Sequence, residues 1–569
     1  MLDATEADDD QVKESIDRAM RLYGAQSVLF SLHVSRLALQ ILELPTTWNR
    51  QLRVNVWRNH TIEALLPLAK PYLNYRGWQT DFRLGGYDDT LIFADWQEAD
   101  AELLWLDSSR FLANTPFADW SQWLGIRLRA LRVVTTAPIL LATWGARSGE
   151  AEALKTLTDN FPAVFFADMM AACDEAGIPL LDSRSATIAG TPVGKSAQLV
   201  LARKLACHWL PAALLPPVKA VVLDLDNTLH YGVLGEDGIE GVQLTRAHAE
   251  LQRYIKSLQQ RGIFIALVSR NERADVEALF AQRLDYPLRW EDFSAIEVSW
   301  EDKAAALERI AKTLHIAPNA MLFVDDNPGE LANVAMKLPQ VHTVLASSDA
   351  SLTQQVIHFY PGIWRWKEES EDVKRIQDLK ANAQRDALAE NLGTPEEYFH
   401  SLKVALVYRN DPQEQLSRLA DLCNKTNQFN LAMRRFNQTE IAVRLGRADA
   451  CVTSVQLTDR FSDSGVIAVV IAEREGEQLV VEELCISCRA IGRQLESTIV
   501  VLALRDMPIF DGCREVAFRV QHGLRNRPAL DWLAHLLDQS ESPSPGLHTL
   551  PVQRLLDFVA VEGIDLNKG

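Results

Sequence analysis

Residues 219–238 read KAVVLDLDNTLHYGVLGEDG, a short apolar run that ends in two aspartates, Asp224 and Asp226. The run predicts a buried strand, and ligands bind just beyond the carboxyl ends of strands in an open parallel sheet. If the strand continues, both carboxylates lie on one side of the backbone, where they repel each other unless a cation neutralises them. An all-oxygen ligand set suits Mg²⁺. A turn with two capping aspartates is the structural alternative.

Three features further along the chain favour a metal site. The apolar run FIALVSR at 264–270 ends near Ser269, whose hydroxyl can hydrogen-bond a phosphoryl oxygen. Lys303 opens a predicted helix, where its charge can balance a phosphate. The run MLFVDDN at 321–327 supplies two more carboxylates, Asp325 and Asp326. Together these residues predict a phosphorus-handling pocket around one divalent ion.

The ordered set D-x-D-x-T, Ser, Lys and D-D resembles the haloacid dehalogenase (HAD) superfamily of aspartyl phosphotransferases over roughly residues 219–360. The resemblance implies that Asp224 is the nucleophile and that Asp226 is the general acid and base. It also implies that Mg²⁺ is held by Asp224, the main-chain carbonyl of Asp226, and Asp326 or Asp325, with Asp326 preferred. The expected phosphoryl-binding and loop-supporting residues are Lys303, Thr228, Ser269, Arg270 and Asn271.

Longer motifs narrow the resemblance to the FkbH-like proteins, the glyceryl transferase/phosphatases of polyketide biosynthesis. They are YGVLGEDG at 231–238, NKTNQFNLAMRR at 424–435, TDRFSDSGVIAVV at 458–470 and ISCRAIGRQLE at 486–496. His230 and Tyr231 replace the Trp-Gly of the family pattern. The resemblance implies that a glyceryl unit from 1,3-bisphosphoglycerate is dephosphorylated and loaded as a thioester on the phosphopantetheine arm of an acyl carrier protein.

The segment CISCRAIGR at 485–493 resembles the R-x-x-G-x-G/A loop of GNAT-like acyltransferases. Arg489 and Gly492 match its first two fixed positions, whereas Gln494 departs from the last. The resemblance implies that the loop receives the pantetheine arm, with Arg493 adding positive charge. Cys488 is a candidate acyl carrier or thiol-site residue, and core packing explains it equally well.

A polar cluster precedes this loop in the chain. Its members are Asn424, Lys425, Asn427 and Gln428. They are candidates for binding glyceryl hydroxyls or pantetheine amides, and a capped helix terminus explains the same residues as well from spacing alone.

Alternating apolar and helical stretches predict an α/β multidomain chain. We expect a helical arm at 1–50, a flavodoxin-like α/β domain at 51–215, an HAD-like domain at 216–365, a helical linker at 366–400 and a GNAT-like α+β domain at 401–569. The arm packs on its own chain or docks a partner. The domain at 51–215 resembles SGNH hydrolases in layout but lacks their G-D-S and D-x-x-H motifs, so we expect it to be non-catalytic. The proline-rich stretch at 210–219 predicts a helix break at a domain boundary.

Bulk composition excludes several classes of protein. The chain has 569 residues and a net charge of −18, which argues against a general nucleic-acid or anionic-membrane surface. Seven scattered cysteines do not form a disulfide framework, and neither a signal peptide nor a membrane-length apolar run is evident. These features predict a soluble, cytoplasmic protein, and the motifs make it an enzyme by resemblance. A non-catalytic docking module of a polyketide assembly line and a plain HAD small-molecule phosphatase remain the alternatives.

Overall fold

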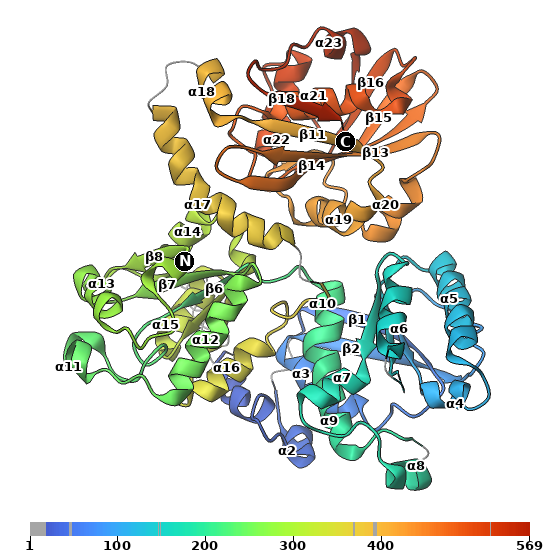
Figure 1. Cartoon of the computed structure of the whole chain (residues 1–569), viewed down its shortest axis with the longest axis vertical. Helices are drawn as coiled ribbons and strands as arrows, with labels where there is room; N and C mark the ends of the chain where they lie inside the picture. Colours follow the sequence, from blue (N-terminus) through green and yellow to red (C-terminus); the bar gives the residue numbers. More distant parts are fainter. Residues whose placement is uncertain are drawn as a thin grey trace, which may run out of the picture. The chain divides into compact units, whose positions relative to one another are not determined.

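A computed structural model describes residues 19–44, 48–145, 147, 149–189, 191–367, 370–390, 395–523 and 525–568 (Figure 1). The chain divides into two compact units whose boundary falls between residues 367 and 370. The first unit contains two parallel sheets and the second contains one mixed sheet. The protein is therefore a multi-sheet α/β chain. In the part that the structure describes, no helix combines the length and apolar character needed to cross a membrane.

The first sheet is parallel throughout and has the strand order β2-β1-β3-β4-β5. Its strands are β1 Arg50–Arg58, β2 Trp78–Tyr87, β3 Ala101–Trp105, β4 Ile139–Thr143 and β5 Val164–Asp168. Every residue of β3 and β4 is buried, because helices cover both faces. Helices α3 Leu66–Tyr75 and α9 Lys195–Lys204 pack on one face, and α5 Phe117–Val134 and α6 Glu150–Asp159 pack on the other. This strand order is that of flavodoxin-like folds.

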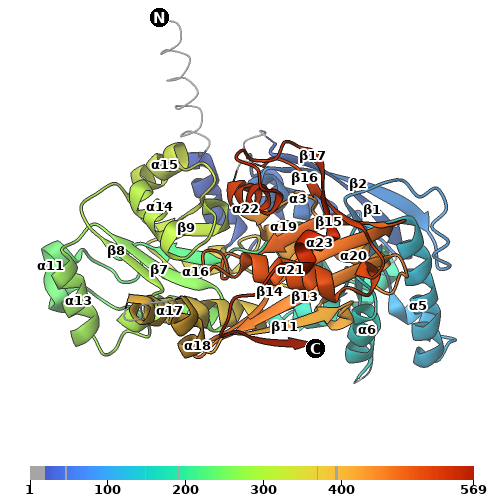
Figure 2. The same cartoon turned by 90° about the horizontal axis from the view of Figure 1, so that it is seen from above.

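The second sheet is also parallel, with the order β10-β9-β6-β7-β8. Its strands are β6 Ala220–Leu223, β7 Phe264–Ser269, β8 Ala295–Val298, β9 Met321–Asp325 and β10 His342–Leu345. The helices that follow them are α11 Leu234–Gly241, α12 Arg246–Gln260, α13 Arg273–Gln282, α14 Lys303–Thr313, α15 Pro328–Lys337 and α16 Ala350–His358. Helix α11 lies against α13 in both views (Figures 1 and 2).

The chain builds this second sheet outward from β6 in both directions. It runs from β6 to β7 and β8 on one side and then returns to place β9 and β10 on the other. The carboxyl ends of β6 and β9 therefore flank the point where the strand order reverses. In doubly wound folds this switch point forms the ligand-binding crevice.

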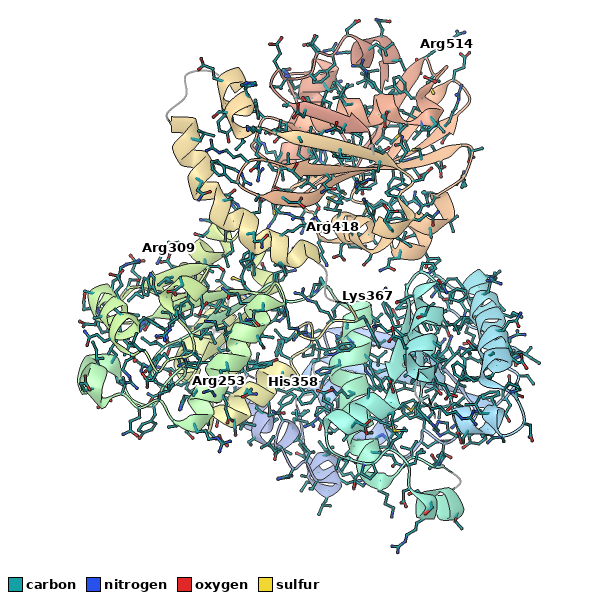
Figure 3. The ribbon with its side chains drawn as sticks, in the orientation of Figure 1. Arg253, Arg309, His358, Lys367, Arg418 and Arg514 are labelled. Carbon is teal, nitrogen blue, oxygen red and sulfur yellow. The ribbon has the colours of Figure 1, made fainter. Side chains whose placement is uncertain are left out.

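The second unit contains one mixed sheet, ordered β17-β16-β15-β14-β13-β11-β18, with β12 paired to the end of β15. Its strands are β11 Ala405–Asn410, β12 Phe429–Asn430, β13 Ala450–Thr458, β14 Asp463–Glu475, β15 Gln478–Ile486, β16 Glu515–Val520, β17 Gly546–Pro551 and β18 Asp565–Lys568. Its helices are α17 Ser370–Glu390, α18 Pro395–Leu402, α19 Leu416–Lys425, α20 Gln438–Arg444, α21 Glu496–Asp506, α22 Arg527–Leu537 and α23 Val552–Leu556. Arg418 of α19 donates to the carbonyl of Val466 on β14 (Figure 3).

The hairpin of β14 and β15 turns at Gly476, whose φ of +66° suits glycine. Beyond it, β15 pairs with the parallel strand β16 only from Gln478 to Val481. The far end of β15 pairs with β12 instead. The two parallel strands therefore stop pairing midway along β15.

The predicted helix break at 210–219 is wrong for the first half of that stretch. Helix α9 continues through a π-helical turn, Leu205–Trp209, into α10 Leu210–Leu214, and the helical path ends at Leu215. Pro211 lies in the first turn of α10, where a residue without an N–H is tolerated.

The described part of the amino-terminal arm contacts the second sheet. Residues 19–29 are helical, and the side chain of Gln26 both donates to and accepts from the main chain of Leu345 on β10. The hydroxyl of Tyr23 lies 2.8 Å from that of Thr343. These contacts are those expected of an arm that packs on its own chain. Residues 1–18 of the predicted arm lie outside the described residues.

Candidate active site

Three carboxylates meet at the switch point of the second sheet. Asp224 directly follows β6, and Asp325 is the last residue of the neighbouring strand β9, with Asp326 next in the chain. One carboxylate oxygen from each of the three lies within 4.8 Å of the others. Asp224 and Asp325 are buried, and Asp326 is half-buried. The strand order thus gathers acids that are about a hundred residues apart in the sequence.

Lys303 provides the positive charge next to these acids. It is the first residue of α14, a helix whose amino terminus is capped by Asp302. The Lys303 ammonium lies 2.7 Å from Asp224 Oδ1 and 2.6 Å from Asp325 Oδ2. Burial opposes its charge, but the two carboxylates outweigh burial and hold the pKa of Lys303 above its usual value.

One ammonium does not neutralise three carboxylates. Burial, followed by the charge of Asp325, raises the pKa of Asp326, and burial raises the pKa of Asp224 despite the nearby Lys303. The three ionised carboxylates exceed the single Lys303 ammonium by two negative charges, which a divalent cation would balance. The donors are all carboxylate oxygens, which fits Mg²⁺. Asp224, Asp325 and Asp326 are the side chains that would hold it.

The carboxylate of Asp226 is not part of this cluster but is fixed by neighbouring hydrogen-bond donors. Its Oδ1 accepts from the main-chain N–H of Leu234 at 2.9 Å, and its Oδ2 accepts from Asn271 Nδ2 at 2.8 Å. His230 Nε2 lies 3.2 Å from Oδ1. Burial alone would raise the pKa of Asp226, but hydrogen bonds from His230, Leu234 and Asn271 lower it. The predicted metal contact of Asp226 through its main-chain carbonyl stays a prediction.

Of the other residues predicted around the phosphoryl group, Ser269 and Asn271 lie beside Asp226, whereas Arg270 pairs with another acid. Ser269 ends β7, and its buried hydroxyl lies 2.9 Å from Asn271 Nδ2, so both belong to the edge that carries Asp226. Thr228 is also buried, and its hydroxyl has no hydrogen-bond partner among the residues described. Arg270 pairs with Glu330 of α15 at 2.9 Å, which engages its guanidinium.

Mg²⁺ is expected to raise the melting temperature (Tm) of the protein, because a ligand that binds only the folded state stabilises it by about 2.7 kcal/mol at a hundred times its Kd. Asp326→Asn removes one ligand charge from the cluster, and we expect the same shift to need at least about tenfold more Mg²⁺. Thermal unfolding across a Mg²⁺ titration measures both effects. Asp285→Asn, at an exposed residue paired with Arg283, is the matched control. Equal Mg²⁺ responses in both variants would remove Asp326 from the ligand set.

The predicted thiol loop lies in the second unit, after β15. The strand ends at Ile486, so Cys485 is a buried strand residue, whereas Cys488 is half-buried in the loop with Arg489. Gly492 has a φ of +80°, and its N–H donates to Glu496 Oε1 at 2.6 Å. Glu496 is the first residue of α21. Its carboxylate thus accepts the hydrogen bond of an N–H group in the loop that is predicted to bind pantetheine.

Arg493, predicted to add positive charge to this loop, is instead engaged in a buried ion network. Its guanidinium lies 3.2 Å from Asp378 of α17 and 3.2 Å from Asp459. Arg385 of α17 pairs with the same two aspartates, at 2.7 and 2.8 Å. The network joins α17 to the loops of the mixed sheet, which gives Arg493 a structural role.

The polar cluster at 424–428 lies at the carboxyl end of α19. Asn424 Nδ2 donates to the carbonyls of Ala420 and Phe436, and Asn427 accepts from Arg435. Lys425 pairs with Asp421, one turn earlier in the helix, and Gln428 is exposed. These contacts are those expected of a capped helix terminus, the structural alternative.

Glu483 is a buried acid that the sequence analysis does not single out. It lies on β15 beyond the point where pairing with β16 ends. Its Oε1 accepts from the N–H groups of Leu484 and Ala432, and its Oε2 has no partner among the described residues. Burial raises its pKa to about 7. The sequence offers one signal, a pair of glutamates inside the apolar strand VVEELC.

Glu483→Gln is expected to stabilise the protein at alkaline pH. Below the ordinary pKa of 4.5 the carboxyl is neutral in both folded and unfolded chains, so it costs no stability there. Between pH 4.5 and about 7 the unfolded chain is ionised while the buried carboxyl stays protonated, so stability of about 3 kcal/mol is lost progressively across this window. The variant should therefore gain about 3 kcal/mol at pH 8 and about 1 kcal/mol at pH 5.

Denaturant unfolding at the two pH values measures this gain. Glu477→Gln, at an exposed residue of the same unit, is the control and should show no comparable pH dependence. A gain that is equal at pH 5 and pH 8 would contradict the raised pKa of Glu483.

Comparison with models of known protein families gives no match, and neither does comparison with curated proteins. Among solved structures, the N-terminal part of a Bacteroides fragilis protein, described as containing a phosphatase domain complexed with Mg, aligns over 56% of this chain and 95% of its own, at 19% identity and a TM-score of 0.43. A spermidine N-acetyltransferase from Vibrio cholerae aligns over 27% of this chain and 96% of its own, at 12% identity and a TM-score of 0.20. A GCN5-related glucosamine N-acetyltransferase region of a fungal enzyme aligns over 93% and 68%, at 9% identity and a TM-score of 0.18. These similarities are too weak to assign a function, which must be inferred from the residues of the site.

Proposed function

We propose that the protein is an HAD-type, Mg²⁺-dependent phosphotransferase that uses Asp224 as its nucleophile. The observation that carries the proposal is the convergence of Asp224, Asp325, Asp326 and Lys303 at the switch point of a parallel sheet. A cluster of three acids and one lysine in which all but Asp326 are buried is costly for a purely structural role. A divalent cation would balance the negative charge of the carboxylates, and a phosphoryl group would pair with the ammonium of Lys303.

The chemistry follows from the positions of two carboxylates. An oxygen of Asp224 attacks phosphorus, and the bond from phosphorus to the leaving oxygen breaks. Asp226 gives a proton to that oxygen, and in the second half of the reaction it takes a proton from the water that hydrolyses the aspartyl phosphate. Lys303 and Ser269 hold the phosphoryl oxygens. Mg²⁺, when bound, neutralises the dianionic phosphate and so permits attack by an anionic nucleophile.

We further propose that the substrate is 1,3-bisphosphoglycerate and that the acceptor is an acyl carrier protein of polyketide biosynthesis. A thiolate forms a bond to the acyl carbon while the bond from that carbon to the phosphate oxygen breaks and phosphate leaves, and the remaining phosphate ester is hydrolysed at Asp224. The product is a glyceryl thioester on the phosphopantetheine arm. The FkbH-like motifs in both units support this proposal, as does Cys488, the one cysteine of seven that is not buried.

Intact-protein mass spectrometry of a carrier protein incubated with bisphosphoglycerate, Mg²⁺ and the enzyme tests these proposals. A glyceryl adduct is the expected result. Free phosphate without an adduct would indicate a plain phosphatase, and an unchanged carrier with no phosphate released would indicate a non-catalytic docking module. Cys488→Ser tests whether the acyl group passes through Cys488 or reaches the carrier thiol directly. Unchanged loading would exclude an obligatory acyl-cysteine.

A further inference from the structure

His230 is fully buried between the proposed acid–base residue and a tyrosine from a distant loop. Its Nε2 lies 3.2 Å from Asp226 Oδ1, and its Nδ1 lies 3.0 Å from the hydroxyl of Tyr286. Tyr286 is itself 1% exposed and lies 56 residues further along the chain. The three side chains thus form a continuous buried chain of hydrogen bonds that ends at Asp226.

The hydrogen-bond pattern assigns the tautomer of His230. A carboxylate oxygen only accepts, so Nε2 must carry the proton that it donates to Asp226. In the neutral imidazole Nδ1 then has a lone pair, which accepts from the hydroxyl of Tyr286. The opposite tautomer would direct a nitrogen lone pair at the carboxylate and leave Nε2 without a donor role. Each polar atom of the imidazole is paired in the first arrangement.

The same contacts distinguish the two oxygens of Asp226. Oδ1 accepts from both His230 and the N–H of Leu234, which occupies its two lone pairs. Oδ2 accepts only from Asn271 among the described residues, so one acceptor position stays free there. Oδ2 is therefore the atom placed to exchange a proton with a substrate.

The loops that carry His230 and Tyr286 are connected through Gln252 of α12. This fully buried side chain donates to the carbonyl of Leu229 at 2.8 Å and accepts from the N–H of Leu288 at 3.3 Å. Because Leu229 precedes His230 and Leu288 lies two residues after Tyr286, Gln252 fixes the spacing of both partners. The arrangement is built into the domain and does not depend on a surface side chain.

We propose that His230 and Tyr286 are positioning residues that fix the rotation of the Asp226 carboxylate, so that Oδ2 is the oxygen that transfers the proton. This inference rests on the proposed phosphotransferase function. Without the His230 contact, the Asp226 carboxylate keeps one hydrogen bond at each oxygen, from the N–H of Leu234 and from Asn271, and is less restrained against rotation about its Cβ–Cγ bond. A misplaced proton donor slows the reaction without weakening substrate binding.

The leaving group of the substrate separates this role from a general structural one. A p-nitrophenolate leaves without a proton, whereas the alkoxide of glycerol 2-phosphate requires one. With His230→Phe we expect kcat/KM for glycerol 2-phosphate to fall about 10- to 100-fold, because residues that orient an active group have effects of this size. For p-nitrophenyl phosphate we expect a change of less than about threefold, because kcat/KM includes only the steps up to phosphoryl-enzyme formation.

Two further variants sharpen the test. His230→Gln keeps an N–H that can reach Asp226 and should recover much of the lost activity on glycerol 2-phosphate. His248→Gln is the matched control, since His248 is a buried histidine nearby that bonds Thr245 and does not contact Asp226. Equal losses of kcat/KM on both substrates in His230→Phe would overturn the inference. Activity of this variant on glycerol 2-phosphate that equals that of the wild type would also overturn it.

Nitrogen NMR of the metal-free protein gives an independent measurement. We expect His230 to be the Nε2–H tautomer in the wild type and in Tyr286→Phe, because the Asp226 carboxylate still requires a donor at Nε2, whereas the Nδ1 resonance should shift when its hydrogen-bond donor is removed. An Nδ1–H tautomer in the wild type would overturn the inference even if the enzyme is active. A wild-type protein without Mg²⁺-dependent phosphate release would refute the proposed function instead, whatever the tautomer of His230.

Discussion

Asp224→Asn is expected to lower Mg²⁺-dependent phosphate release about 10⁴-fold or more, because loss of a covalent nucleophile is among the largest single-residue effects in catalysis. The asparagine has nearly the same shape, so the pocket should persist. Lys303 also contacts Asp325 at 2.6 Å, and this second ion pair should remain in the variant. Since burial already raises the pKa of Asp224, removal of its charge should not lower the Tm.

Phosphate release from an alkyl phosphate and from bisphosphoglycerate measures the effect. Asp285→Asn, on the surface of the same unit, is the control and should keep wild-type rates. Mass spectrometry of the quenched reaction should detect a phosphoryl adduct on wild-type protein and none on the variant. Phosphate release that survives in Asp224→Asn would remove the nucleophile assignment and with it the proposed reaction.

Arg493→Met is expected to destabilise the second unit by about 3–5 kcal/mol, the usual cost of removing one partner from a buried ion network. Asp378 and Asp459 have side chains that are 2% and 0% exposed, and after the change Arg385 is the remaining arginine that pairs with both among the described residues. Burial opposes the charge of Asp378, and Arg493 makes the largest contribution among the groups that nevertheless lower its pKa. Methionine replaces much of the buried aliphatic volume, so the loss reports mainly on charge.

Denaturant unfolding of the full chain measures this loss. Arg514→Met is the matched control, because Arg514 is an exposed residue of the same unit (Figure 3) whose surface pair with Glu477 should contribute only about 0–1 kcal/mol. If Arg493→Met leaves the stability unchanged but weakens loading of the carrier, Arg493 has the ligand-binding role that the sequence predicts and not a structural one.

The second sheet was largely predictable, because its central strands are continuous apolar runs. The runs at 219–226, 264–270 and 321–327 are β6, β7 and β9, and the predicted helix after Lys303 is α14. The short edge strands β8 and β10 were not predicted. Their residues are mostly half-buried and lack the uninterrupted apolar character of a central strand. The edge strand β2, with its polar sequence WQTDFRLGGY, was missed for the same reason.

The site was predictable where its residues end strands and unpredictable where they meet through loops. Asp224 and Asp325 follow apolar runs, so the parallel-sheet rule brings them together. No periodicity links His230 to Tyr286, and only the folded chain places them 3.0 Å apart. The partners of Arg493 lie 115 and 34 residues away in the sequence, which is why the motif alone predicted a positive charge for the pantetheine-binding loop and not an ion network.

The distribution of the cysteines has a practical consequence for labelling. Six of the seven thiols are buried and only Cys488 is partly accessible, so a maleimide dye should attach to the native chain at one position. Unfolding should release the other six to the same reagent. The number of dyes per molecule then reports how much of a sample is native, and a dye at Cys488 places a fluorescent reporter on the loop after β15.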